Sequence, residues 1–406
     1  MPFAWFIALR YLRTDKAQSA LVLAAVSIGV SVIVFLSALI NGLQVSLIDK
    51  TLGSQPHVTL RRLREVPRPQ VGPTTGTAVA QRVQASSQRL RSIDQWPAVM
   101  ADAERVAGVT ALSPVVAGAG FALRADAREP IFLRGVDPER FLAIIDLRPK
   151  LREGRFAIAG GDVVLGSTLA DNLGVAVGDK LRITTSEGVE DTVTVNGVFS
   201  LGNDAVDSRW VLTSLRHAQS LFALPGGCTS IELKVSDIFA AESIANELHE
   251  RSGLDASSWM RENAELLRGL SAQSGSKSLI EFFVTLTVAL GIASVLIVSV
   301  VQKEREIGIL RAVGTPRKRV LAVFLIQGGV LGCAGAILGS GLGAVFAKLF
   351  EGLAVGPDGA PRFLVQLDLP LFAGATALAV GVGLLAAVLP ASRAARLDPA
   401  TAIRHV

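Results

Sequence analysis

The stretch that decides the fold is VQKEREIGILRAVGTPRKR, residues 301–319, a charged segment between two long apolar runs. Its central part repeats apolar residues at helical spacing, and its last part is strongly basic. If the flanking runs span a membrane, these cations place the segment at the cytoplasmic face. Because it meets only soluble molecules there, it predicts a chain that is moved by a cytoplasmic partner.

The apolar runs are long enough to cross a membrane. A bilayer core of ~30 Å requires ~20 mostly apolar helical residues. Four stretches without any ionisable side chain meet this requirement: Ser19–Leu43, Phe282–Val301, Val320–Phe346 and Leu371–Leu389. A cleaved signal peptide is the alternative for the first stretch. Its apolar core is normally ~7–15 residues long, which is far shorter than this one.

Basic residues cluster at one side of the four stretches. They are Arg10, Arg13 and Lys16, then the cations of residues 303–319, then Arg393, Arg396 and Arg404. The positive-inside rule therefore puts both termini and the charged segment in the cytoplasm. The predicted fold is a membrane α-helical protein with four transmembrane helices, arranged one plus three, and a large extracytoplasmic α+β domain. We divide the chain into a cytoplasmic amphipathic segment (1–18), a first span (19–43), the outer domain with stalk helices at both ends (44–278), a second span (279–301), a cytoplasmic coupling loop (302–319), a third span (320–347), a short external loop (348–370), a fourth span (371–389) and a cytoplasmic tail (390–406).

Composition agrees with a membrane protein. Half of the residues are apolar, the mean hydropathy is +0.47 and the isoelectric point is near 9.5. Because the basic residues gather at membrane borders, topology explains them and a nucleic-acid partner is not implied. Cys333 lies in the third span and Cys228 in the outer domain, so no disulfide framework is expected.

The outer segment has the pattern of a folded α+β domain. Strands are expected at 113–116, 120–123, 131–133, 162–165, 180–185, 191–198, 210–212 and 230–235, and helices at 167–173, at 215–222 and after Asp237. Residues Arg61–Trp96, rich in Arg, Pro and Gly, suggest a loop followed by a polar helix, to which we assign no function.

The chain carries little chemistry of its own. No ionisable group lies at mid-span, where proton relays and ion pumps need one. The nearest approach to a phosphate loop, Gly269–Ser278, has its Gly-Lys pair interrupted. Ser167 is not in a hydrolase elbow, and no metal-ligand spacing links His57, His217, His249 and His405. We therefore expect neither catalytic residues nor a metal or other cofactor in this chain.

The third span carries a stripe of small residues on one helix face. Its members are Gly328, Gly332, Gly335, Gly339 and Gly343. Such spacing lets another helix approach closely. Two interpretations stay open: packing within one chain, or a sliding or dimer surface.

The charged segment itself predicts a short helix over residues 304–313. Ile307, Leu310 and Val313 recur at helical spacing, Gly314 ends the helix and Pro316 follows it. A solvated turn whose cations fix topology is the simpler interpretation, but it requires no apolar ridge. A ridge in an aqueous loop favours a docking surface for a groove in a partner.

Residues 304–314, with the sequence EREIGILRAVG, resemble the signature of the FtsX-like permease family of ABC transporters, the MacB/LolC/LolE type. Further matching segments place the chain closest in appearance to the LolC/LolE subgroup: residues 8–13, 41–44, 56–60, 134–138, 164–178 and 390–399. The resemblance covers most of the chain in order and implies the one-plus-three arrangement of spans.

The resemblance implies a permease subunit of the bacterial inner membrane that dimerises with a second copy or a paralogue. It would bind a cytoplasmic ABC ATPase dimer, which carries the ATP and Mg, and transmit its motion to the outer face. The implied stalks are residues 46–52 and 262–279. The implied ATPase-coupling residues are Glu304, Arg305, Glu306, Ile307, Gly308, Leu310, Arg311, Val313 and Gly314.

What the transporter acts on stays open at this point. Release or export of a lipoprotein, a lipid or another amphiphilic cargo is expected, with a periplasmic adaptor or lipoprotein chaperone as a possible outer partner. LolC carries a long, proline-bearing hook that captures a chaperone, but the hairpin at Thr184–Thr194 here turns tightly and has no proline. A tripartite efflux permease, an FtsX-type regulator of a cell-wall hydrolase and a membrane-anchored adhesion domain are the alternatives.

Overall fold

The computed structural model describes residues 3–63, 90–354 and 365–396. It divides into a helical unit, residues 1–47 with 268–406, and a mixed unit, residues 48–267. Among the described residues, four helices are long and apolar enough to cross a membrane. Together with the sheet described below, they confirm the predicted fold class.

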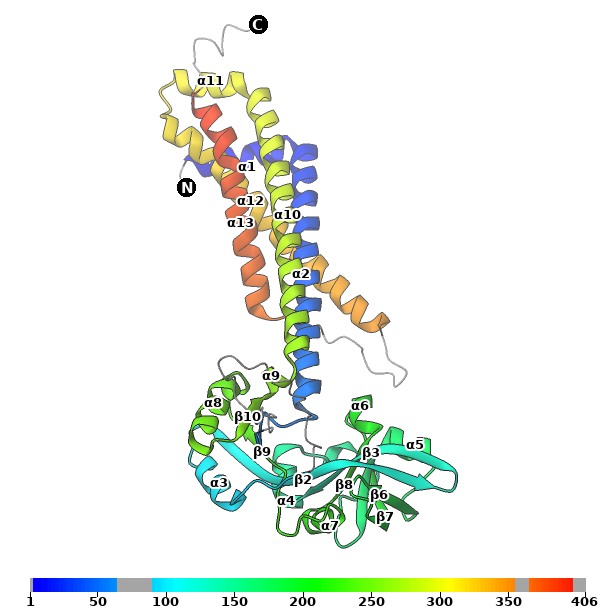
Figure 1. Ribbon diagram of the computed structural model, residues 1–406. Helices are drawn as coiled ribbons and strands as arrows, with labels where there is room; N and C mark the ends of the chain where they lie inside the picture. The colour runs from blue at the N-terminus through cyan, green and yellow to red at the C-terminus, as the bar shows by residue number, and fades with distance from the viewer. Residues whose placement is uncertain (1–2, 64–89, 355–364, 397–406) are drawn as a thin grey trace, which may run out of the picture. The chain divides into compact units, whose positions relative to one another are not determined.

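The helical unit is made of long and short helices (Figure 1). Its elements are α1 (Phe3–Thr14), α2 (Lys16–Leu52), α10 (Ala264–Gln302), α11 (Glu304–Ala312), α12 (Arg317–Leu353) and α13 (Leu369–Arg396). The four apolar stretches lie inside α2, α10, α12 and α13. Helix α12 continues to Leu353, so residues 348–353, which we expected in an external loop, are helical. Both predicted stalk segments belong to helices: residues 46–52 end α2, and most of 262–279 begins α10.

The mixed unit is built on one ten-stranded sheet in the described part of the chain. The strands are β1 (Val58–Arg61), β2 (Val109–Arg124), β3 (Ala127–Val136), β4 (Leu151–Gly154), β5 (Asp162–Gly166), β6 (Lys180–Thr185), β7 (Glu190–Phe199), β8 (Trp210–Ser214), β9 (Ser230–Val235) and β10 (Asp255–Ser258). Their order is β10-β1-β9-β2-β3-β8-β5-β7-β4, and β6 pairs with β2 and β7. Most pairs are antiparallel; β3 with β8 and β5 with β7 are parallel.

Helices cover both faces of this sheet and complete three hydrophobic cores. They are α3 (Trp96–Ala103), α4 (Pro138–Ile144), α5 (Ser167–Leu173), α6 (Asp204–Asp207), α7 (Leu215–Leu221), α8 (Ala241–Ser252) and α9 (Trp259–Glu262), with 3₁₀ turns η1 (Arg148–Lys150) and η2 (Ile238–Ala240). The helices α5 and α7 pack on one core, α4 and α6 on a second, and α3, α8 and α9 on a third.

Two sequence expectations for this unit have definite outcomes, and a third has none. The two strands expected at 113–116 and 120–123 are one long strand, β2, which pairs with β9 at its start and with β3 and β6 at its end. The hairpin of β6 and β7 turns tightly, with Gly188 at φ +79°, so the tight turn expected there is confirmed. Residues 64–89, where we expected the polar helix, lie outside the described residues.

Candidate functional site

The charged segment forms the short helix α11 between α10 and α12. Its end has the geometry of a Schellman motif: the Gly314 amide donates to the Arg311 carbonyl (3.0 Å), and the Thr315 amide donates to the Leu310 carbonyl (3.1 Å). Gly314 has φ +98°, a left-handed conformation that glycine adopts without strain. The predicted stop at Gly314 is therefore confirmed.

The predicted apolar ridge does not lie on one face, which corrects the expectation. The side chain of Ile307 is only 2% exposed, Leu310 is half-buried and Val313 is 83% exposed. Residues three apart in a helix shift by about 60° around the axis at each step, so a triplet with this spacing winds around the helix. Ile309, which the pattern left out, is 48% exposed.

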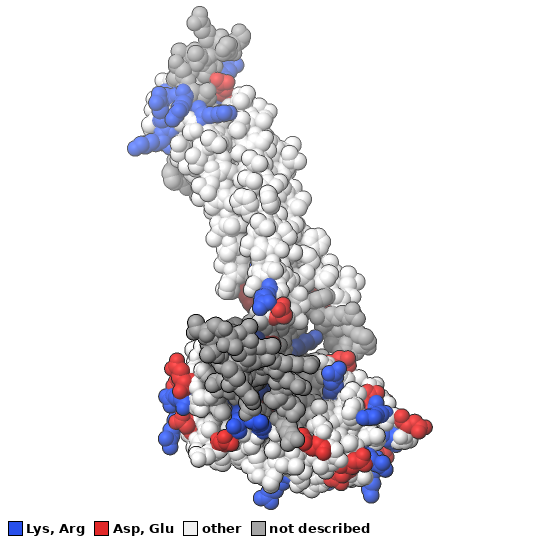
Figure 2. All heavy atoms as spheres, viewed as in Figure 1, with Lys and Arg blue, Asp and Glu red and all other residues white. Residues whose placement is uncertain are grey.

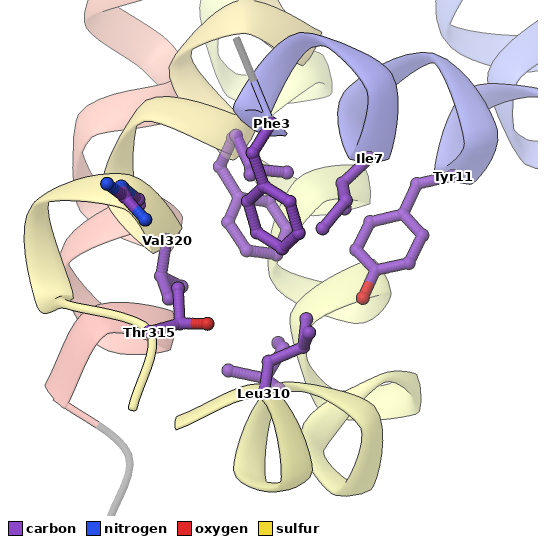
Figure 3. Close-up of a pocket in the computed structure, with 10 residues that line it drawn as sticks. Phe3, Ile7, Tyr11, Leu310, Thr315 and Val320 are labelled. Atoms are coloured by element: carbon purple, nitrogen blue, oxygen red, sulfur yellow. The ribbon is translucent and has the colours of Figure 1, made fainter. Parts of the chain in front are cut away.

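The chain's own helices bury the inward side of α11. Ile307 belongs to a small core made by α10, α12 and α13, whose other members are Val300, Val320, Phe324, Ala391 and Ala394. Leu310 lines a shallow pocket between α11, α12 and α1. Figure 3 shows Phe3, Ile7 and Tyr11 of α1 on one side of this pocket and Leu310 on the other. The contact with α1 was not foreseen, although its aromatic and apolar pattern was visible in the sequence.

Tyr11 joins this pocket to the charges of α11. Its side chain is buried and forms a hydrogen bond with the Glu306 carboxylate. Burial, with the negative charge of Glu306, raises the pKa of Tyr11 to about 12. The phenol therefore stays protonated at neutral pH and keeps its O–H available as a donor to Glu306.

The remaining predicted residues of α11 differ in exposure. Arg305, Glu306 and Gly314 are exposed, Glu304 and Arg311 are half-buried, and Gly308 is buried against the bundle. Arg305, Ile309 and Val313 give an exposed surface of mixed apolar and charged character, whereas Glu306 bonds to Tyr11. Figure 2 shows Lys and Arg side chains gathered at the end of the helical unit that carries α11, next to an almost uncharged flank.

The glycine stripe of α12 packs within the chain. A Cβ added at any of its positions would collide with a neighbouring helix. The atoms nearest to the added Cβ are the Gly383 carbonyl oxygen (2.3 Å, for Gly328), the Ala379 carbonyl oxygen (2.6 Å, for Gly332), Val26 Cγ1 (2.5 Å, for Gly335), the Ser27 carbonyl oxygen (2.5 Å, for Gly339) and the Ser31 carbonyl oxygen (2.8 Å, for Gly343). The first two glycines therefore face α13 and the last three face α2. Of the two interpretations, the structure supports packing within one chain.

A row of polar contacts between α2 and α10 was missed. Gln44 Nε2 donates to Ser274 Oγ (2.8 Å), Lys277 Nζ to Asn41 Oδ1 (3.4 Å) and Ser37 Oγ to Glu281 Oε1 (2.9 Å). Lys277 also pairs with Glu281 on its own helix at 3.7 Å. Figure 1 shows the two helices side by side along this seam. The members are spaced by three or four residues on each helix, a signal that is visible only when both partners are known.

The segment 134–138, which contributed to the family resemblance, has a structural role. Arg134 and Glu232 form a buried ion pair across the sheet (2.5 Å), and the Arg134 guanidinium lies 4.0 Å from the centre of the Trp210 ring. Asp137 caps α4 by accepting hydrogen bonds from two backbone amides. A Cβ at Gly135 would lie 2.2 Å from the Ala218 side chain. These contacts hold β3 to its neighbours and to α7.

In the described part of the chain, no group of three or more His, Cys, Asp or Glu is placed to hold a metal ion. The His57 ring contacts the backbone of Val235, and desolvation lowers the pKa of His57. His217 lies 3.4 Å from Asp191, and His249 contacts the Leu254 carbonyl. His405 lies outside the described residues.

Two family models match the chain. Residues 19–251 match the MacB-like periplasmic core domain, and residues 278–399 match the FtsX-like permease C-terminal region. The chain is 26% identical to the lipoprotein-releasing system transmembrane protein LolC of Xylella fastidiosa, over 100% of this chain and 99% of that protein. It is 23% identical to LolC of Neisseria meningitidis, over 99% of each, and 23% identical to LolE of Haemophilus influenzae, over 98% of each.

Proposed function

This chain belongs to the family of ABC transporter permeases that join a MacB-like periplasmic core domain to an FtsX-like C-terminal region, and we propose that it acts in lipoprotein release. In this proposal it is a multi-pass inner-membrane subunit with both termini in the cytoplasm. A separate ATPase dimer binds ATP and Mg and hydrolyses the nucleotide. The permease transmits the resulting motion to its periplasmic domain, where a lipoprotein or another amphiphilic cargo leaves the membrane.

The observation that carries this proposal is the similarity to LolC and LolE over nearly the full length of both chains. A match confined to the C-terminal region would support only a permease of unspecified cargo. Here a single alignment with the lipoprotein-releasing proteins covers both the membrane helices and the outer domain. A second permease, either a copy or a paralogue, completes the proposed membrane part.

Helix α11 is the proposed contact with the ATPase. Its inward side packs on the bundle, so its position depends on that of α10 and α12. Its outward side offers Ile309 and Val313 among charged residues. We place the docking surface on these two residues and on Arg305, in place of the ridge that included Ile307 and Leu310. Burying each aliphatic side chain in a partner groove contributes ~1.5–3 kcal/mol.

The test is co-purification of the full chain with its ATPase, followed by mass spectrometry of bound molecules. We expect a lipoprotein among them and no ATP hydrolysis by the permease alone. Recovery of an adaptor and an outer-membrane channel instead would support the efflux alternative, and recovery of a cell-wall hydrolase would support the regulator. ATP turnover by a preparation free of other subunits would contradict the proposal.

The docking surface has its own test. Val313→Asp removes an exposed apolar contact, so association with the ATPase should weaken about tenfold or more. The control is Arg396→Gln, which changes the net charge by the same amount at an exposed site on α13. Equal losses in both variants would reduce α11 to a turn that sets topology.

Orientation is tested with two exposed positions, because Cys228 is buried and cannot report it. Phe239→Cys in the mixed unit and Val313→Cys in α11 place thiols at sites that are 64% and 83% exposed. In intact spheroplasts, a membrane-impermeant thiol reagent should label only the Phe239→Cys variant. Labelling of the Val313→Cys variant before permeabilisation would refute the proposed topology.

A further inference from the structure

Two helix bends face each other at the end of the helical unit that carries α11. Asp15 is the single residue between α1 and α2, and Lys303 is the single residue between α10 and α11. Lys303 Nζ lies 2.9 Å from Asp15 Oδ2. The ion pair therefore joins one bend to the other across 288 positions of the 406-residue chain.

Each bend interrupts the helix at one residue, which keeps its own helical hydrogen bonds on both sides. The Asp15 amide donates to the Tyr11 carbonyl and the Ser19 amide donates to the Asp15 carbonyl. In the same way, Lys303 bonds to Ser299 and Ile307 bonds to Lys303. Because the regular helix stops at each bend, a tertiary contact is needed to select the direction in which α1 and α11 leave them.

The ion pair is well placed for this because it is largely withdrawn from solvent. The Lys303 side chain is 7% exposed and that of Asp15 is 27% exposed. A buried ammonium is strongly disfavoured unless it is paired, so the orientation that brings Asp15 to it is selected over others. The Tyr11 ring, 4.6 Å from Lys303 Nζ, adds a cation–π contact from α1.

Further contacts between α1 and α11 follow the same face. Lys303 meets Asp15 and Tyr11, Glu306 bonds to Tyr11, and Leu310 lines the pocket with Ile7. Positions 303, 306 and 310 repeat at three and four residues, which puts them on one side of α11. This side is turned toward α1, whereas Ile309 is exposed on the helix and Val313 is exposed just beyond its last residue, Ala312.

We propose that Asp15 and Lys303 form a clamp that sets the orientation of α11 on the helical unit, and with it the presentation of Ile309 and Val313 to the ATPase. The second part rests on the proposed function. Both are positioning residues: they act through α11 and touch neither nucleotide nor cargo. Helix α1 is then part of the coupling element and more than an anchor for the first span.

The orientation is measured without the ATPase. In a Cys333→Ala background, Ile7→Cys and Leu310→Cys place thiols in the pocket shared by α1 and α11. A short bismaleimide should cross-link them efficiently when the clamp is intact. Asp15→Asn should lower the cross-linking yield at least threefold, and the reversed pair, Asp15→Lys with Lys303→Glu, should restore most of it. Thermal unfolding of each variant in detergent separates a moved helix from an unfolded protein. An unchanged yield in folded Asp15→Asn, or a reversed pair no better than the single variant, would overturn the clamp.

Association with the ATPase tests the second part. Asp15→Asn should weaken it about tenfold, and the reversed pair should recover it, with Arg396→Gln as the control at an exposed site. If cross-linking falls but association does not, the clamp does not position the docking surface. If the wild-type chain binds no ATPase while cross-linking still depends on the clamp, the proposed function fails and the orienting role of Asp15 and Lys303 stands.

Discussion

The glycine stripe of α12 and the apolar triplet of α11 follow helical spacing in the sequence, yet they end in different environments. All five glycines of the stripe are buried against neighbouring helices of the same chain. The triplet separates, with Ile307 in a core, Leu310 at a pocket and Val313 exposed. The glycine stripe therefore forms a single buried face, whereas the members of the apolar triplet lie in three different environments.

The difference comes from the spacing and from the neighbours. An α-helix turns about 100° per residue, so the steps of four, three, four and four keep the glycines within about 80° of arc. Two steps of three spread the triplet over about 120°. In addition, α12 is packed along most of its length, whereas α11 ends at Ala312 and leaves Val313 at its cap. Spacing alone therefore predicts a face only where the helix continues and has partners along it.

The largest expected difference in stability is between substitutions at the two isoleucines of α11. Ile307→Asp should lower the free energy of unfolding by about 4 kcal/mol or more, because it removes a buried side chain and leaves an unpaired buried carboxylate. Ile309→Asp, at an exposed site, should change it by about 0.5 kcal/mol or less. Thermal unfolding in detergent, followed by tryptophan fluorescence, measures both. Similar losses would mean that α11 has no inward side.

Cys228 extends the comparison to the mixed unit. Its side chain is fully buried, and burial raises the pKa of its thiol to about 11, from an ordinary value of 9.0. Since the thiolate is the reactive form, labelling of the native Cys333→Ala variant at pH 8 should be at least about a hundredfold slower than after denaturation. The folded state holds this proton more tightly than the unfolded state. The contribution of Cys228 to stability is therefore complete below about pH 9 and is lost as the pH rises to about 11. Rapid labelling of the folded protein would contradict its burial.

Two glycines of one helix test the stripe. Gly339→Ala puts a Cβ about 2.5 Å from the Ser27 carbonyl oxygen and should cost ~1–3 kcal/mol by overpacking. Gly341 has open space around it, so Gly341→Ala should be neutral or stabilise the helix by up to ~1 kcal/mol. Unfolding in detergent gives the difference. Equal effects of the two substitutions would show that α2 does not approach α12 as closely as described.

The smallest expected change in stability is at the seam of α2 and α10. There the two helices contact each other through side chains and not through closely packed backbones. Gln44→Ala removes the hydrogen bond to Ser274 and should cost ~0.5–1.5 kcal/mol. In a double-mutant cycle, Ser274→Ala in the Gln44→Ala background should cost less than it does alone. Additive losses would mean that the two side chains do not interact.

The sequence was sufficient to predict the features that a single residue or a single run of residues determines. Long runs without ionisable residues predicted the four spanning helices, and Gly314 before Pro316 predicted the end of α11. Glycines at turns predicted the tight hairpin of β6 and β7. The full extent of β2 was not predictable, because Gly118 and Ala119 interrupt the pattern that a strand needs while the pairing with β3 continues through them.

The sequence by itself determined the membrane spans, the existence of α11 and the identity of the residues that form the close-packed stripe. Hydrophobicity, helix capping and side-chain size are local properties, and each acts within a few residues. Only the tertiary structure decided which helices receive the stripe, which side of α11 is buried, and that Asp15 meets Lys303. These outcomes depend on where separate helices cross. The neighbours of Asp15 in the sequence do not specify that it meets the buried Lys303. In the same way, the neighbours of the stripe glycines do not specify which helix backbones pack against them.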